Sequence, residues 1–152
     1  MNKQAGFTLV ELVVVIVILG LLAATALPKF INVTNNARTA SVQGVAGGLR
    51  SAVSLARAQY VLDGSKTSTS ISMDGATVAV LAETGNTGMG GRPTGTSTGI
   101  EVAMPSPDGF TIDDTTTAGT VVYTPSGGSA TCYVKYEEKR SNDPVFVDVS
   151  GC

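Results

Sequence analysis

The chain has 152 residues, of which 43% are hydrophobic and 14% are charged, and its ten basic and twelve acidic side chains give a net charge of −2. This balance supplies no basic face for nucleic acid, and the length is enough for one soluble domain beside an apolar N-terminal stretch. Histidine is missing and there are only two cysteines. We therefore expect neither an enzyme nor a metal site.

Residues 1–6 are a short polar leader with one charged side chain, Lys3, and an apolar run follows over residues 7–27, with Glu11 as its one charge. As a helix the run would be about 31 Å long at about 1.5 Å per residue, which matches a hydrocarbon core about 30 Å thick. It is longer than the apolar core of a secretory signal peptide, and the small residue Gly6 precedes it instead of following it. We therefore expect a membrane-spanning helix.

The two cysteines, Cys132 and Cys152, are expected to form one disulfide. Disulfides persist outside the cytoplasm, and Lys3 precedes the apolar run, although Lys29 on the other side weakens this charge bias. Both observations favour a cytoplasmic N-terminus and a domain in an oxidising space. The bridge would close a loop of about 20 residues and stabilise the fold by roughly 3 kcal/mol.

The start of the apolar run resembles the type IV prepilin signature through the sequence Gly6-Phe7-Thr8-Leu9-Val10-Glu11-Leu12. The resemblance implies that a membrane-embedded prepilin peptidase cleaves between Gly6 and Phe7 on the cytoplasmic side, and that the new amine of Phe7 is methylated.

Glu11 calls for a partner, because a carboxylate in a spanning helix costs about 2.5–3.5 kcal/mol on insertion scales. Cleavage after Gly6 would place an amine on Phe7, one turn away, in the same chain or in a neighbouring subunit. The resemblance favours the neighbour and gives Glu11 a role in subunit register, whereas a carboxylate near the lipid headgroups is the alternative. Thr8 is counted with Glu11 among the expected assembly residues, and the alternative is that its hydroxyl only bonds to backbone carbonyls of its own helix.

Two further residues of the run, and the proline just after it, concern the packing and the course of the helix. Gly20 and Ala24, four positions apart, would let another helix approach closely. Pro28 has no amide hydrogen and is expected to kink or interrupt the helix. The resemblance implies that residues 20–28 are extended in a filament, while a single subunit can stay helical.

Residues 29–62 place apolar and small side chains three and four positions apart, which predicts an amphipathic helix that packs against a sheet. The expected buried positions are Phe30, Val33, Ala37, Ala40, Gly44 or Val45, Leu49, Ala52 or Val53, Ala56 and Tyr60. Asp63 and Gly64 are expected to end this helix. This part resembles mannose-sensitive haemagglutinin-type pilins through residues 28–33 and through Ala37 and Arg38.

Residues 64–99 are rich in glycine, serine and threonine and are expected to form a loop, within which residues 76–82 could be a strand or a helical turn. Short apolar runs then predict an antiparallel sheet, with strands over residues 100–104, 110–112, 120–124, 130–136 and 145–149. One face, carrying Val122, Val134 and Phe146 or their alternates, would cover the helix. The predicted fold class is α+β, a long N-terminal α-helix packed on a C-terminal antiparallel β-sheet, and the resemblance implies the pilin fold.

The resemblance also implies that residues 132–152 form a disulfide-bounded loop on a filament surface, which in pilins often serves adhesion. Its expected tip consists of Glu137, Glu138, Lys139, Arg140, Ser141, Asn142 and Asp143. A solvated hairpin without a receptor is the alternative.

The expected organisation is a cleaved leader over residues 1–6, a polymerisation helix over residues 7–28 and a globular head over residues 29–152. By resemblance the chain is the structural subunit of a type IV pilus, a helical homopolymer that is held in the inner membrane, processed by the prepilin peptidase and methylase, and built by the pilus assembly machinery into an extracellular filament. Adhesion to surfaces or cells would follow, with motility as a further use. The alternatives are a pseudopilin of a type II secretion system and a membrane-anchored monomeric binding domain. No cofactor is implied.

Overall fold

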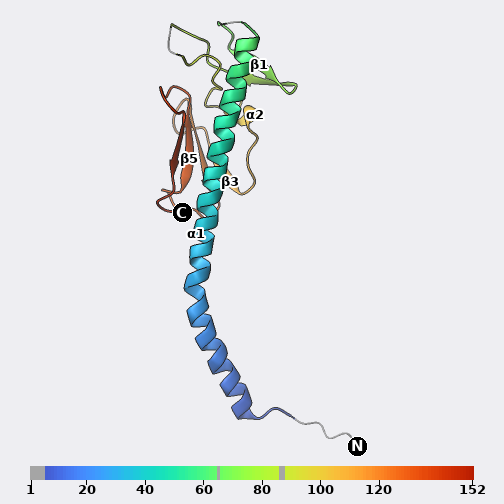
Figure 1. Cartoon of the computed structure of the whole chain (residues 1–152), viewed down its shortest axis with the longest axis vertical. Helices are drawn as coiled ribbons and strands as arrows, with labels where there is room; N and C mark the ends of the chain where they lie inside the picture. Colours follow the sequence, from blue (N-terminus) through green and yellow to red (C-terminus); the bar gives the residue numbers. More distant parts are fainter. Residues whose placement is uncertain (1–5, 65, 86–87) are drawn as a thin grey trace, which may run out of the picture. The chain divides into compact units, whose positions relative to one another are not determined.

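A computed structural model describes residues 6–64, 66–85 and 88–152, with the backbone alone for residues 27–32. The chain divides into an N-terminal unit, residues 1–37, and a head unit, residues 38–152, which are described separately below. The elements are α1 (Leu9–Leu62), β1 (Ser70–Met73), β2 (Ala76–Ala79), α2 (Ile100–Ala103), β3 (Phe110–Asp113), β4 (Thr120–Pro125), β5 (Tyr133–Glu137) and β6 (Val145–Asp148) (Figure 1). This order, one long helix before an antiparallel sheet, confirms the predicted α+β class.

In the N-terminal unit the structure describes the chain from Gly6. The helix α1 begins at Leu9 and forms the rest of this unit, up to Ala37. The helix is assigned without a break through Pro28, so the interruption considered for this residue is not present in the single chain. The side chains of Pro28 and Phe30 lie outside the described residues, as do residues 1–5 of the expected leader. Val33 is 64% exposed and Ala37 is exposed as well, so the predicted burial of these two residues is wrong.

In the head unit, α1 presents one apolar face to the sheet. Its buried residues are Val42, Val45, Ala46, Leu49, Ala52, Val53, Ala56 and Tyr60. The predicted face is correct from Val45 onward, but Ala40 is exposed and Val42 takes its place in the core. The helix ends as expected, because Gly64 has a φ of +68°, a conformation that glycine adopts at little cost.

The sheet is an antiparallel meander in the order β3-β4-β5-β6, and Figure 1 shows β3 and β5 beside the head part of α1. Its helix-facing side chains are Val121, Tyr123, Val134, Tyr136 and Val145, which share one core cluster with α1. Of the predicted apolar face, only Val134 belongs to this set. Phe146 is 38% exposed and lies on the outer face with the side chain of Lys135. The core is therefore formed by residues adjacent to Val122 and Phe146 in their strands, which point to the opposite face.

Two predicted segments take a different form. Residues 100–104 were expected to be a strand, but Ile100–Ala103 form the short helix α2, in which the N–H of Met104 donates to the carbonyl of Ile100. Residues 64–99 contain a hairpin, because β1 pairs with β2 across a turn at Asp74 and Gly75 whose φ angles are +47° and +79°. Paired positive φ angles are typical of the type I′ turn that an Asp-Gly sequence favours.

Candidate assembly segment and surface loop

The apolar segment Leu9–Ala26 is the one described helix long and apolar enough to cross a membrane, and none of its side chains is buried within the chain. Residues as large as Leu9, Leu12 and Leu21 expose 77%, 62% and 66% of their surface. A Cβ atom placed on Gly20 would meet nothing within 4 Å. Such a surface is stable only when lipid or other protein covers it.

Thr8 and Glu11 form a capping box at the start of α1. Oε2 of Glu11 accepts hydrogen bonds from the N–H of Thr8 at 2.8 Å and from its hydroxyl at 2.8 Å, and the N–H of Glu11 donates to Oγ1 of Thr8 at 3.2 Å. The alternative that the Thr8 hydroxyl only bonds to helix carbonyls is therefore wrong. The spacing of Thr and Glu, three apart and just before an apolar run, is a known signal for this cap, and it was missed.

The proposed processing junction lies before the first helical turn. Gly6 and Phe7 precede Leu9, where α1 begins, and both are exposed, with 91% of the surface of Phe7 accessible. The junction is thus accessible backbone outside regular structure, as a peptidase substrate must be.

Cys132 and Cys152 form a disulfide with an S–S distance of 2.08 Å and a sequence separation of 20. Cys132 immediately precedes β5 and is fully buried in the head core, and Cys152 packs against the same cluster. The bridge therefore ties the end of the chain to the start of β5, on the side of the sheet that faces α1.

The tip of this disulfide-bounded loop is fastened from within by Arg92, a residue that the sequence reasoning missed. Arg92 is only 4% exposed, and its guanidinium donates to the backbone carbonyls of Glu138, Arg140, Ser141 and Asn142. A signal was available, because Arg92 is the only charged residue between Glu83 and Glu101.

Glu138 and Asp143 brace the same tip on either side. Glu138, expected at the exposed tip, is only 8% exposed, and its Oε2 accepts the N–H of Gly95 at 2.8 Å. The carboxylate of Asp143 forms an ion pair with the guanidinium of Arg50 in α1, at a distance of 2.8 Å. Burial acts to raise the pKa of Asp143, but the hydrogen bonds from Arg50 and from the N–H of Val145 outweigh burial and place this pKa below its usual value.

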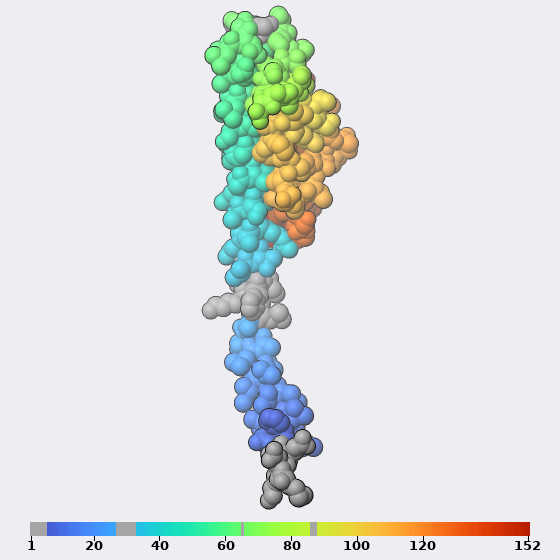
Figure 2. Space-filling model, turned by 90° about the vertical axis from the view of Figure 1, so that its right-hand side faces the viewer, coloured from blue at the N-terminus to red at the C-terminus, as the bar shows by residue number. Residues whose placement is uncertain are grey.

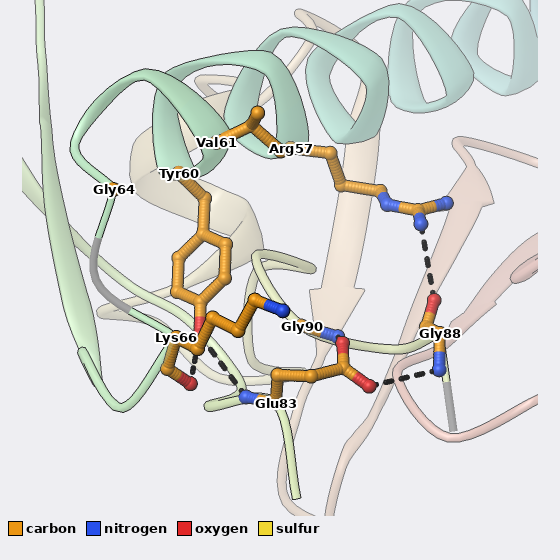
Figure 3. A pocket seen from close by; sticks show the side chains of 8 residues that line it. All are labelled: Arg57, Tyr60, Val61, Gly64, Lys66, Glu83, Gly88 and Gly90. Atoms are coloured by element: carbon orange, nitrogen blue, oxygen red, sulfur yellow. Dashed lines mark hydrogen bonds between the residues drawn. The ribbon is translucent and has the colours of Figure 1, made fainter. Parts of the chain in front are cut away.

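A cavity of about 410 Å³ lies at the C-terminal end of α1 in the head (Figure 3). Its wall is braced by loop contacts: the hydroxyl of Tyr60 accepts the N–H of Glu83, and the carboxylate of Glu83 accepts the N–H groups of Gly88 and Gly90. Its one carboxylate is thus engaged in holding a loop. Within residues 6–64, 66–85 and 88–152, no group of three or more carboxylate, cysteine or histidine side chains is placed to hold a metal ion.

Comparison with known proteins finds fimbrial subunits among the proteins that the chain resembles. A family model described as the prokaryotic N-terminal methylation motif matches residues 1–27. The chain is similar to the type IV narrow pilus major component PilA5 of Thermus thermophilus, with 48% identity over 57 residues, which are 38% of this chain and 49% of that protein. It is also similar to a fimbrial protein of Moraxella nonliquefaciens, with 44% identity over 38% of this chain and 37% of that protein.

A third relative is the type IV major fimbrial protein FimA of Dichelobacter nodosus, with 37% identity over 43% of this chain and 38% of that protein. The chain spans about half of the length of these relatives or less. No solved structure matches it. The methylation motif over residues 1–27, the named relatives and the order of a long helix before an antiparallel sheet agree with one another, and the chain is thus similar to type IV pilins.

Proposed function

We propose that the chain is the structural subunit of a type IV pilus, which polymerises through the apolar part of α1 into an extracellular helical filament. The observation that carries this proposal is that no side chain of Leu9–Ala26 is buried within the single chain. An apolar surface of this length needs a cover in every state of the molecule. Lipid of the inner membrane covers it before assembly, and the same helices of neighbouring subunits cover it afterwards.

Processing by a prepilin peptidase and methylase belongs to this proposal. Cleavage between Gly6 and Phe7 releases the leader and leaves a methylated, positively charged amine on Phe7. Within the described part of the chain, the carboxylate of Glu11 contacts only Thr8, and both contacts use Oε2. Oε1 of Glu11 is therefore available to a cationic amine, and a neighbouring subunit's Phe7 amine is the partner that fixes register.

Adhesion is the use that we propose for the filament, with the disulfide-bounded loop over residues 132–152 as the exposed surface of the head. The support is physical: Lys139, Arg140 and Ser141 are exposed, while Arg92 and the disulfide hold the loop in one conformation. A rigid loop binds a partner with little loss of conformational entropy.

A Glu11→Val substitution tests the assembly role. We expect the variant to enter the membrane in normal amount, because the substitution removes the insertion cost of a carboxylate, and to yield few filaments, because the register contact is lost. The measurement is the ratio of pilin in sheared surface material to pilin in the membrane fraction. Leu12→Val, a change in the same helical turn without a charge, is the control and should assemble normally. An unchanged ratio for Glu11→Val would remove the register role.

A further inference from the structure

Three arginines line one cavity of the head, about 260 Å³ in volume, between α1 and the segment that follows the tip of the disulfide-bounded loop. Arg50 and Arg57 come from α1, and Arg92 comes from the glycine-rich segment before α2. The polar side chains that complete the lining are Ser54, Asn142 and Asp143. Three cations from two distant parts of the sequence thus meet at one hollow.

The charges of this cavity do not balance. Asp143 is its only carboxylate, and Asp143 pairs with Arg50 at 2.8 Å. Among the described residues, Arg57 and Arg92 have no carboxylate within ion-pair distance. Arg57 donates to the carbonyl of Gly88 at 3.1 Å, and Figure 3 shows its guanidinium turned toward that residue. Two positive charges of the lining are therefore met by neutral acceptors alone.

Of the three arginines, Arg92 is the one whose hydrogen-bond donors are least well satisfied. Its side chain is almost fully buried, three of its four hydrogen bonds to carbonyls are 3.4–3.5 Å long, and its Nε has no partner within the described chain. Removing a guanidinium from water without an opposite charge is costly. An anion in the cavity would lower that cost and would add charge-assisted hydrogen bonds, which are the strongest in proteins.

We propose that this cavity binds a tetrahedral oxyanion, a phosphate or sulfate group that is either a free ion or an ester on a sugar. Planar guanidinium groups match the oxygen spacing of such groups. Arg57 and Arg92 supply the charge, while the amide of Asn142 and the hydroxyl of Ser54 offer further polar contacts. A volume near 260 Å³ is at the small end for ligand pockets, which suits one oxyanion with its immediate substituent.

The larger cavity at the end of α1 does not share this character. Arg57 and Lys66 also line this larger cavity, but its Glu83 carboxylate repels an anion and already accepts backbone N–H groups. The oxyanion site is also independent of polymerisation, because all its residues belong to the head unit, and it can be tested on chains that do not assemble.

The test is calorimetric titration of the full chain in a nonionic detergent, first with inorganic phosphate and then with a sulfated disaccharide in the presence of phosphate. We expect saturable binding of one phosphate per chain, and an affinity loss of about tenfold or more in Arg57→Gln, since a charge-assisted contact is removed. Lys139→Gln removes the same charge from an exposed side chain outside the cavity and should leave the affinity unchanged.

The two sources of the oxyanion are distinguished by the second titration. Competition by the disaccharide assigns the site to a sugar ester, and phosphate binding without competition assigns it to the free ion. Arg57 is an exposed helix residue, so its variant is expected to fold, and circular dichroism checks this. No saturable phosphate binding by the wild type, or equal losses in Arg57→Gln and Lys139→Gln, would overturn the proposal.

Discussion

The carboxylate of Glu11 serves the first turn of α1 in the isolated chain, because it closes the capping box with Thr8. That arrangement satisfies backbone N–H groups that an uncapped helix start leaves without acceptors. It also orients Glu11 before any neighbour arrives. A carboxylate held in one rotamer can meet an incoming amine with less loss of side-chain entropy than a mobile one.

Replacing Thr8 tests the cap directly. Thr8→Val keeps the shape of the side chain but removes the hydroxyl, and we expect the start of α1 to lose about 0.5–2 kcal/mol of stability. The measurement is amide hydrogen exchange at Glu11 in the detergent-solubilised chain, which should become several-fold faster. Thr8→Ser keeps the hydroxyl and should exchange as the wild type does. Equal exchange in Thr8→Val and Thr8→Ser would contradict the capping box.

Asp113 gives a prediction about pH. Its carboxylate accepts hydrogen bonds from the hydroxyl of Thr116 and from the N–H and hydroxyl of Thr115, and these hold its pKa at about 2, below the usual 3.8. Because the pKa is lower in the folded chain, the contribution to stability is present above about pH 4 and is lost as the pH falls toward 2.

The titration of Asp113 can be followed by carboxyl carbon chemical shifts. Thr116→Val should move the midpoint upward toward the usual value, while Thr117→Val, which alters no hydrogen bond to Asp113, should leave it near 2. A wild-type midpoint close to 3.8, or equal midpoints in the two variants, would show that the threonine hydroxyl does not hold this carboxylate.

At the scale of elements, the head part of α1 has two sides of different character. One side packs on the sheet, with Leu49 fully buried. The other side remains uncovered along the helix in the space-filling view (Figure 2). Gly44, Ser51 and Leu55 are among the exposed residues of this part of α1. The packing of the sheet on one side is therefore what stabilises this glycine-containing helix in the single chain.

A matched pair of leucines on α1 tests this division. Leu49→Ala should lower the free energy of unfolding of the head by about 2–5 kcal/mol, because it leaves a cavity in the core. Leu55 is 62% exposed, so Leu55→Ala should lower the free energy of unfolding by no more than about 0.5 kcal/mol. Denaturant unfolding followed by the near-ultraviolet circular dichroism of the buried tyrosines measures both. Similar losses in the two variants would contradict the assigned faces.

The elements also show what a sequence can predict and what it cannot. The long helix, its end at Gly64 and four strands of the sheet follow from periodicity and turn residues. The helix α2 does not, because a run as short as Ile100–Ala103 fits a strand or a helical turn equally well, and the burial of Ile100 decides between them only in the fold. The Thr8 cap was readable from spacing, whereas the contacts of Arg92 span 46 to 50 residues and have no local pattern.

At the scale of the whole molecule, the chain joins an apolar helix with no internal cover to a head with its own core and disulfide. The head is held together by contacts within itself, whereas the surface of Leu9–Ala26 depends on its surroundings. Because of this difference, the same chain can be stable first in a membrane and then in a filament, as the proposed function requires.

The most direct test of that account is electron microscopy of sheared cell-surface material, combined with mass spectrometry of its main protein band. We predict long fibres whose main chain lacks residues 1–6 and begins at methylated Phe7. A chain that keeps Met1, or that is found only as a monomer in the membrane, would contradict it.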